Sequence, residues 1–150
     1  MTSKLGDPDI KVDRLDVWLH GRQFPDVQDY WDSDWLSVTA EYKGRDSRVV
    51  AHGPFIHLSE LASFFTALKV LDEKLKGEAV LDCLEPDLHL DIRAKSLGHL
   101  EVEVSLTADN VTESHSYQEQ IDQTPLPLIL GALNQVLSRY PMRDPGKVVR

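Results

Sequence analysis

The sequence predicts an α+β fold in which a largely antiparallel sheet is covered on one face by two amphipathic helices. Two observations predict it. Strand-like segments come in runs and do not alternate with helices, which argues against a parallel α/β arrangement. Apolar residues recur at every second position in most segments, but at every third or fourth position in two of them. We expect one twisted sheet of about six to seven strands, with the element order βββαββββα.

The two helices follow from apolar residues spaced three or four positions apart. The first begins near Ser59, which can cap its start, and Gly77 can close its end. The second follows Thr124 and Pro125, with Thr124 as its N-cap, and it stops at Pro141. The two apolar stripes consist of Leu61, Phe64, Leu68, Leu71 and Leu75, and of Leu126, Ile129, Leu130, Leu133, Val136, Leu137 and Tyr140.

Three segments have the two-residue period of strands with one buried and one solvated face, namely 36–42, 88–95 and 99–106. The last two flank Ser96-Leu97-Gly98. A three-residue loop with Gly98 in a left-handed conformation keeps apolar residues opposite one another. The resulting pairs are Ile92 with Val102, Leu90 with Val104, and Arg93 with Glu101. Weaker strand candidates are 10–19, 48–56, 78–84 and 114–121.

Length and composition indicate one soluble domain over residues 1–150. A chain of 150 residues with 41% hydrophobic and 27% charged residues can bury a sizeable core. Residues 1–8 and 143–150 are polar ends that we expect to be mobile. The formal net charge of −9 argues against nucleic-acid binding and permits a basic protein partner. Solubility explains the same charge equally well.

Cysteine content and hydropathy point to the cytoplasm. Cys83 is the only cysteine, which excludes an internal disulfide and a thiol-rich metal site. We expect Cys83 to be a small, buried, apolar residue of a strand. No apolar run approaches the roughly 20 residues that span a bilayer, and residues 1–9 lack the features of a signal peptide. We therefore expect a cytoplasmic protein without membrane contact.

Residue types that bind metals or catalyse reactions are present, but not in the required spacing. His89, Asp91 and His115 lie on predicted strands and could converge on a metal, yet no HExxH motif or cysteine pair supports such a site. Asp91 and Glu103 share a sheet face with basic residues, which favours a solvated ion-pair lattice over an acid/base pair. Motifs for nucleophiles and phosphate binding are absent. We expect no metal, no cofactor and no enzymatic activity.

The segment of most interest is Asp29-Tyr30-Trp31-Asp32-Ser33-Asp34-Trp35-Leu36, where a loop leads into a strand. One interpretation is that its tryptophans pack the loop against the sheet edge. The other is recognition, because an apolar patch with an acidic rim can bind a basic protein. If the sheet is covered on one side only, Trp18 and Trp35 lie on its open face. The candidate partner-binding residues are therefore Asp29, Trp31, Asp32, Asp34, Trp35 and Trp18.

This segment resembles the tyrosine-tryptophan-aspartate and tryptophan-leucine signature of small bacterial immunity proteins of the WapI type. Similar features follow in the same order over about residues 10–141: Ser-Glu-Leu at 59–61, Leu-Glu-Pro-Asp-Leu at 84–88, Asp-Gln-Thr at 122–124, and Tyr-Pro at 140–141. The resemblance implies a non-enzymatic protein that binds the C-terminal domain of a contact-delivered toxin, often a nuclease, inside the producing cell. The resemblance does not identify binding residues in this sequence.

Our leading expectation is a cytoplasmic immunity protein that neutralises a basic toxin domain by occluding its active site with an acidic, aromatic face. The first alternative is a scaffold or regulatory module that uses the same face for another partner. The second, and weaker, alternative is an enzyme or small-ligand binder with a pocket between sheet and helices.

Overall fold

The computed structural model describes residues 5–27 and 31–143, which form eight strands and two α-helices. Four strands come first: β1 (Ile10–Val12), β2 (Leu15–Arg22), β3 (Trp35–Lys43) and β4 (Arg48–His57). Helix α1 (Leu58–Lys74) follows. The second set of strands is β5 (Glu78–Asp82), β6 (Leu88–Ala94), β7 (His99–Leu106) and β8 (Ser116–Asp122), and helix α2 (Leu126–Arg139) comes last.

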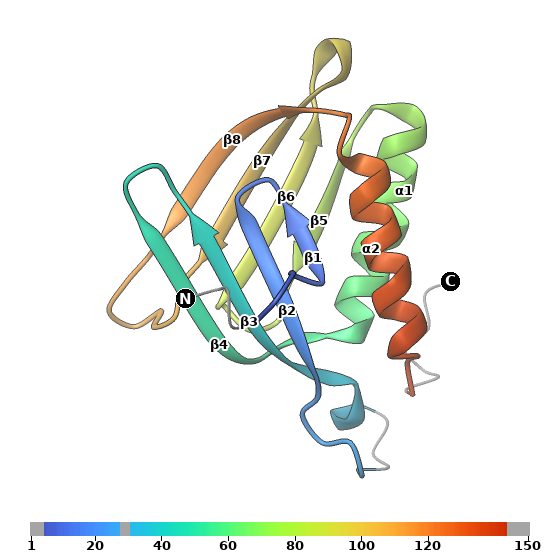
Figure 1. Ribbon diagram of the computed structural model, residues 1–150. Helices are drawn as coiled ribbons and strands as arrows, with labels where there is room; N and C mark the ends of the chain where they lie inside the picture. Colours follow the sequence, from blue (N-terminus) through green and yellow to red (C-terminus); the bar gives the residue numbers. More distant parts are fainter. Residues whose placement is uncertain (1–4, 28–30, 144–150) are drawn as a thin grey trace.

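The strands form two antiparallel sheets of four strands each. The N-terminal sheet has the order β1-β2-β3-β4, and the C-terminal sheet has the order β5-β6-β7-β8. The inner faces of both sheets and both helices share one hydrophobic core. Helix α2 contacts β1 and α1 contacts β5, so the helices lie along the side where the first strand of each sheet is found (Figure 1). The α+β class is confirmed, and the expectation of a single sheet is wrong.

Two physical reasons account for this difference. Alternation of apolar residues shows which face of a strand is buried, but it does not show which strands share hydrogen bonds. In addition, segment 10–19 is two strands and not one, because the chain turns at Asp13, which has a left-handed φ of 53°. Val12 then pairs with Leu15 across a tight hairpin. The order is therefore ββββαββββα, with one strand more than predicted.

The β6–β7 hairpin has the predicted register. Gly98 has a φ of 75°, and the preceding Leu97 is also left-handed, with a φ of 59°. The predicted cross-strand pairs are all present: Ile92 with Val102, Leu90 with Val104, and Arg93 with Glu101.

The helices lie where the periodicity places them, but their caps differ from the prediction. Helix α1 begins one residue earlier, at Leu58, and its N-cap is His57 and not Ser59. Leu75, with a left-handed φ of 53°, ends α1 two residues before Gly77. Pro125 occupies the N-cap position of α2 without a side-chain hydrogen bond.

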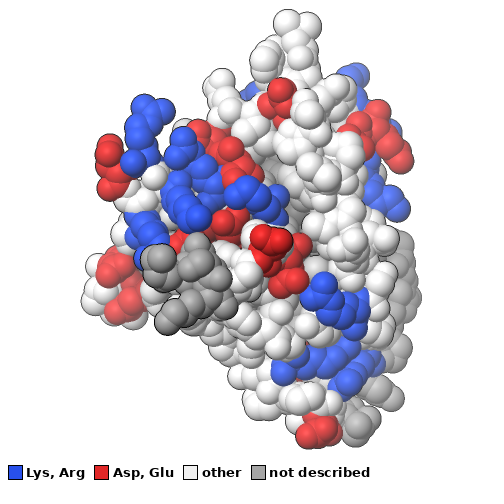
Figure 2. Space-filling view, viewed as in Figure 1, with Lys and Arg blue, Asp and Glu red and all other residues white. Residues whose placement is uncertain are grey.

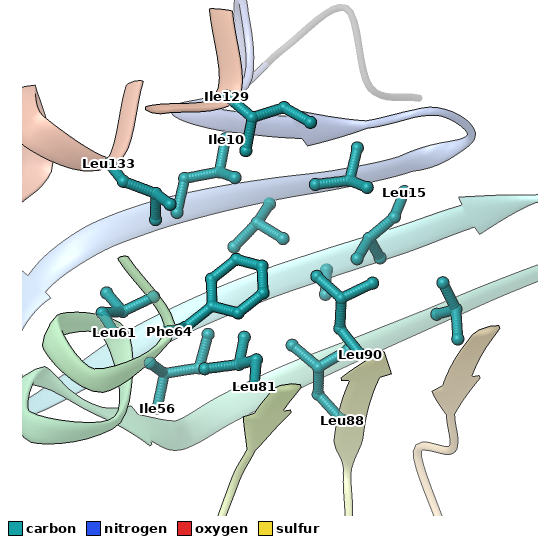
Figure 3. Packing of buried hydrophobic residues seen from close by; sticks show 14 of the residues in the cluster. Ile10, Leu15, Ile56, Leu61, Phe64, Leu81, Leu88, Leu90, Ile129 and Leu133 are labelled. Carbon is teal, nitrogen blue, oxygen red and sulfur yellow. The ribbon is translucent and has the colours of Figure 1, made fainter. Parts of the chain in front are cut away.

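The core fills the space between the two sheets and the two helices. Phe64 and Leu61 of α1 point toward strands of both sheets, and Leu133 of α2 lies near Ile10 of β1 (Figure 3). Leu68 and Leu133, at the centres of the two helical stripes, are fully buried. The predicted helix faces are therefore correct, and their burial joins the two sheets through one apolar interior.

Candidate functional site

The structure places the predicted partner-binding residues in different environments. Asp29 lies outside the described residues. Asp32 is exposed, and Trp31 and Trp35 are half-buried. The segment therefore retains part of the exposed surface that recognition of a partner requires.

Trp18 is buried, with 4% of its surface exposed. Its indole Nε1 donates a hydrogen bond to the Gly6 carbonyl oxygen, at 3.1 Å. Asp9 accepts a hydrogen bond from the backbone N–H of Leu19, at 2.7 Å. These contacts hold the segment before β1 against β2, so the expectation that Trp18 lies on an open face is wrong. Periodicity could not show that the chain's own N-terminal segment would cover it.

Asp34 is fully buried and is not a rim acid. Its Oδ1 forms an ion pair with Arg22, whose Nη1 lies 2.9 Å away. Both carboxylate oxygens also accept the backbone N–H of Arg143, at 2.9 and 3.1 Å. Arg22 donates further hydrogen bonds to the carbonyl oxygens of Ser33 and Pro141. Asp34 therefore links β2 to the segment after α2, part of which was expected to be mobile.

His57 fixes the aromatic segment to the start of α1, a role that the sequence analysis missed. Its ring stacks on Trp31 at a centroid distance of 3.9 Å and meets Trp35 edge-on at 4.9 Å. The ring Nδ1 of His57 accepts a hydrogen bond from the backbone N–H of Ser59 at 3.2 Å. The backbone N–H of His57 donates a hydrogen bond to the Glu60 carboxylate at 2.8 Å. A cap residue followed three positions later by glutamate is the sequence signal for this arrangement.

Buried carboxylates lie on the outer face of the N-terminal sheet. Asp16 and Glu41 are directly opposed on β2 and β3, and they are 5% and 1% exposed. Lys11 binds Asp16 at 2.8 Å, while Arg48 pairs with Glu41. Lysine and arginine side chains gather over the β1–β2 turn and the β3–β4 hairpin (Figure 2). The acidic rim expected around Trp18 is therefore covered by basic side chains.

The outer face of the C-terminal sheet is acidic. We call it the acidic face, and it comprises Arg93 and the carboxylates of Glu78, Asp82, Asp91, Glu101 and Glu103. Arg93 lies within 4 Å of four of them, at 3.0 Å from Asp91 and 3.1 Å from Glu101. The predicted ion-pair lattice is present, with four acids around a single arginine and Asp82 beside His89.

Two details of the acidic face bear on binding. The Asp91 side chain is nine-tenths buried, and its Oδ1 has no hydrogen-bond partner in the described part of the chain. The hydrogen bond to Asp91 raises the pKa of Arg93, which keeps the guanidinium charged. The side chains of Glu78, Glu101 and Glu103 are 53%, 22% and 32% exposed. A partner can therefore reach several carboxylates of this face.

Comparison with models of protein families identifies the family of this chain. The model of the immunity protein WapI-like family matches residues 7–141. The chain belongs to this family. The resemblance based on the aromatic segment is thus confirmed, and no curated protein and no solved structure matches the chain.

Immunity protein families are generally non-enzymatic. Across residues 5–27 and 31–143, no group of three histidine, cysteine or acidic side chains is placed to hold a metal ion. His89 and His115 do not converge: they pair separately with Asp82 and Glu113. Burial raises the pKa of the Cys83 thiol, which disfavours the nucleophilic thiolate. No helix among the described residues is long and apolar enough to cross a membrane.

Proposed function

We propose that this member of the WapI-like family is an immunity protein that neutralises a basic toxin domain, with a nuclease as the favoured class, by covering its active site. The acidic face is the proposed contact surface. The single observation that carries this assignment is the gathering of five carboxylates, four of them around one arginine, on an accessible sheet face. Nuclease sites favour positive charge because their substrates are polyanions.

Electrostatics supports this surface over the outer face of the N-terminal sheet. Several like charges on one face attract a partner of opposite charge and speed its association. The basic side chains above Asp16 and Glu41 make the other face a poorer match for a basic partner.

The aromatic segment is proposed as a second contact. Asp32 is exposed, and the half-buried Trp31 and Trp35 can offer part of their rings to a partner. Asp29 belongs to the same proposal. The roles of Trp18 and Asp34 follow from their buried hydrogen bonds, so we assign them to positioning these elements.

The protein is proposed to act in the cytoplasm of the toxin-producing cell as a single domain without catalysis. Binding to nucleic acid or membrane is not part of the proposal, since the net charge of −9 opposes contact with polyanions. The alternative is a scaffold or regulatory module that uses the acidic face for a basic partner other than a toxin.

Binding kinetics would test the proposal, with the C-terminal domain of a toxin encoded by the neighbouring gene as the partner. The variant Glu78→Gln, Glu101→Gln, Glu103→Gln removes three charges from the acidic face while preserving shape. We expect an on-rate lower by about tenfold or more at low salt, with a weaker salt dependence. The control Asp46→Asn, Glu73→Gln, Glu85→Gln makes the same change in net charge at exposed positions elsewhere. It should bind like the native protein.

Equal effects of the two triple variants would show that net charge matters and that the acidic face does not. Co-expression with the toxin domain tests neutralisation itself: the native protein should restore growth. Failure of the native protein to bind the neighbouring domain would favour the scaffold alternative.

A further inference from the structure

The turn between β6 and β7 holds a side chain that does not suit its backbone. Leu97 and Gly98 are both left-handed, with φ values of 59° and 75°. The backbone N–H of His99 donates to the carbonyl oxygen of Ser96 and closes the turn. Two consecutive left-handed residues are typical of a type I′ turn, for which Asn-Gly is the preferred sequence. Leucine is therefore a poor residue for the first of these two positions.

Packing within the chain does not compensate for the strain at Leu97. The residue is 94% exposed, the highest value among the exposed large apolar residues of the described part of the chain. A left-handed backbone is costly for a residue with a Cβ atom. Leu75, the other left-handed leucine, is half-buried and ends α1. Position 97 thus combines backbone strain with exposed apolar surface, and such strain is typical of functional sites.

The turn lies at the end of a braced projection. The β6–β7 hairpin extends beyond the neighbouring elements (Figure 1), and its apex shows no charged side chain in the space-filling view (Figure 2). The backbone N–H of Lys95 donates to the His99 carbonyl oxygen at 2.7 Å, just below the turn. Gly98 lies against Gln123, since a Cβ at position 98 would lie 3.0 Å from its Oε1. Leu97 is therefore held in place before a partner binds, which reduces the entropy lost on binding.

The acidic face begins at the base of the same hairpin. Arg93 and Glu101 form the cross-strand pair that lies four residues before and after Leu97. At about 3.3 Å per residue they are roughly 13 Å from the tip, and a standard interface of about 800 Å² per partner covers both. A basic partner attracted by Glu101 and Glu103 therefore also meets Leu97. A protruding apolar tip fits a concave site, and active sites are clefts of this kind.

We propose that Leu97 is an apolar anchor that enters a cleft of the toxin domain, next to the basic surface bound by the acidic face. This inference rests on the proposed function, and it adds the residue that holds the complex together after electrostatic attraction has formed it. A few side chains that fill pockets usually dominate the affinity of an interface. A second copy of this chain is a poorer occupant, because two acidic faces and two net charges of −9 repel each other.

Binding kinetics with the toxin domain and thermal denaturation of the same variants test the anchor. Leu97→Asn creates the Asn-Gly sequence that the turn prefers, so the melting temperature should rise by about 2 °C. The off-rate of this variant from the toxin domain should increase by about tenfold or more, with the on-rate and its salt dependence unchanged. Leu97→Met keeps an apolar side chain of similar volume, and its off-rate should stay within about threefold of the native value.

Leu84→Asn is the matched control, because Leu84 is also exposed and precedes β6 at the end away from the turn. It should bind the toxin domain as the native protein does. A native off-rate in Leu97→Asn would refute the anchor and leave the proposed function intact, and a lower melting temperature would overturn the argument from strain. Absence of binding by the native protein would overturn the function and the anchor together. A change of the free protein from dimer to monomer in Leu97→Asn would assign the tip to contacts between copies and refute the anchor.

Discussion

His57 stacks on Trp31 and, with its Nε2 2.9 Å from the Trp31 carbonyl oxygen, holds the aromatic segment in place. Because Nδ1 of His57 accepts the N–H of Ser59, the ring proton lies on Nε2 and donates to that carbonyl. The same residue therefore caps α1 and anchors the segment that carries the family signature.

We expect His57→Ala to lower the free energy of unfolding by at least about 2 kcal/mol, since it removes a helix cap and an aromatic stack. Urea denaturation measures the loss. The matched change His99→Ala, at an exposed histidine, should stay within about 0.5 kcal/mol of the native protein. Similar losses in both variants would mean that the buried contacts of His57 contribute little.

Substitution by asparagine should lower the free energy of unfolding much more at Asp34 than at Asp32. Asp34→Asn leaves the buried guanidinium of Arg22 without its counter-charge, which we expect to cost about 3–5 kcal/mol. Asp32→Asn changes an exposed carboxylate and should cost about 0.5 kcal/mol or less. Thermal and chemical denaturation of the two variants provide the comparison. A stable Asp34→Asn protein would contradict the structural role of the Asp34–Arg22 pair.

The two helical stripes offer a test of the shared core. Leu68→Ala and Leu133→Ala each remove a fully buried leucine side chain, and each should cost about 2–5 kcal/mol. Leu128→Ala, at an exposed position on α2, serves as the control and should cost little. Losses below about 1 kcal/mol at both buried positions would contradict the observed helix faces.

Tyr42 should make stability depend on alkaline pH. Burial, together with the nearby Glu119 carboxylate, raises the pKa of Tyr42 from 10.0 to about 12. The folded protein therefore holds this proton more tightly than the unfolded chain, and its stabilising effect is present below pH 10 and lost as pH rises through about 12. Tyr42→Phe lacks this titration.

Denaturation of the native protein and of Tyr42→Phe from about pH 9 to about pH 12 should show a steeper loss in the native protein. Tyr140→Phe, at a half-buried tyrosine outside the two sheets, is the control, and it should follow the native curve. Parallel curves for the native protein and Tyr42→Phe would exclude Tyr42 as the titrating group.

Local features were predictable because their causes lie within a few residues. The spacing of Leu61, Phe64 and Leu68 defined a helix face, and the alternation across 88–106 with Gly98 in the loop defined the register of a hairpin. The aromatic segment was sufficient to suggest the family to which the chain belongs. These conclusions needed no knowledge of distant contacts.

Only the tertiary structure decided how the strands divide into two sheets and which charged residues stay exposed. Asp34 and Asp32 are two residues apart in the same segment, yet Asp34 is buried against Arg22 and Arg143 while Asp32 is exposed. Trp18 alternates as an outward residue, but the chain before β1 covers it. Burial of such side chains depends on segments far away in sequence, and a periodic pattern contains no information about which segments will meet.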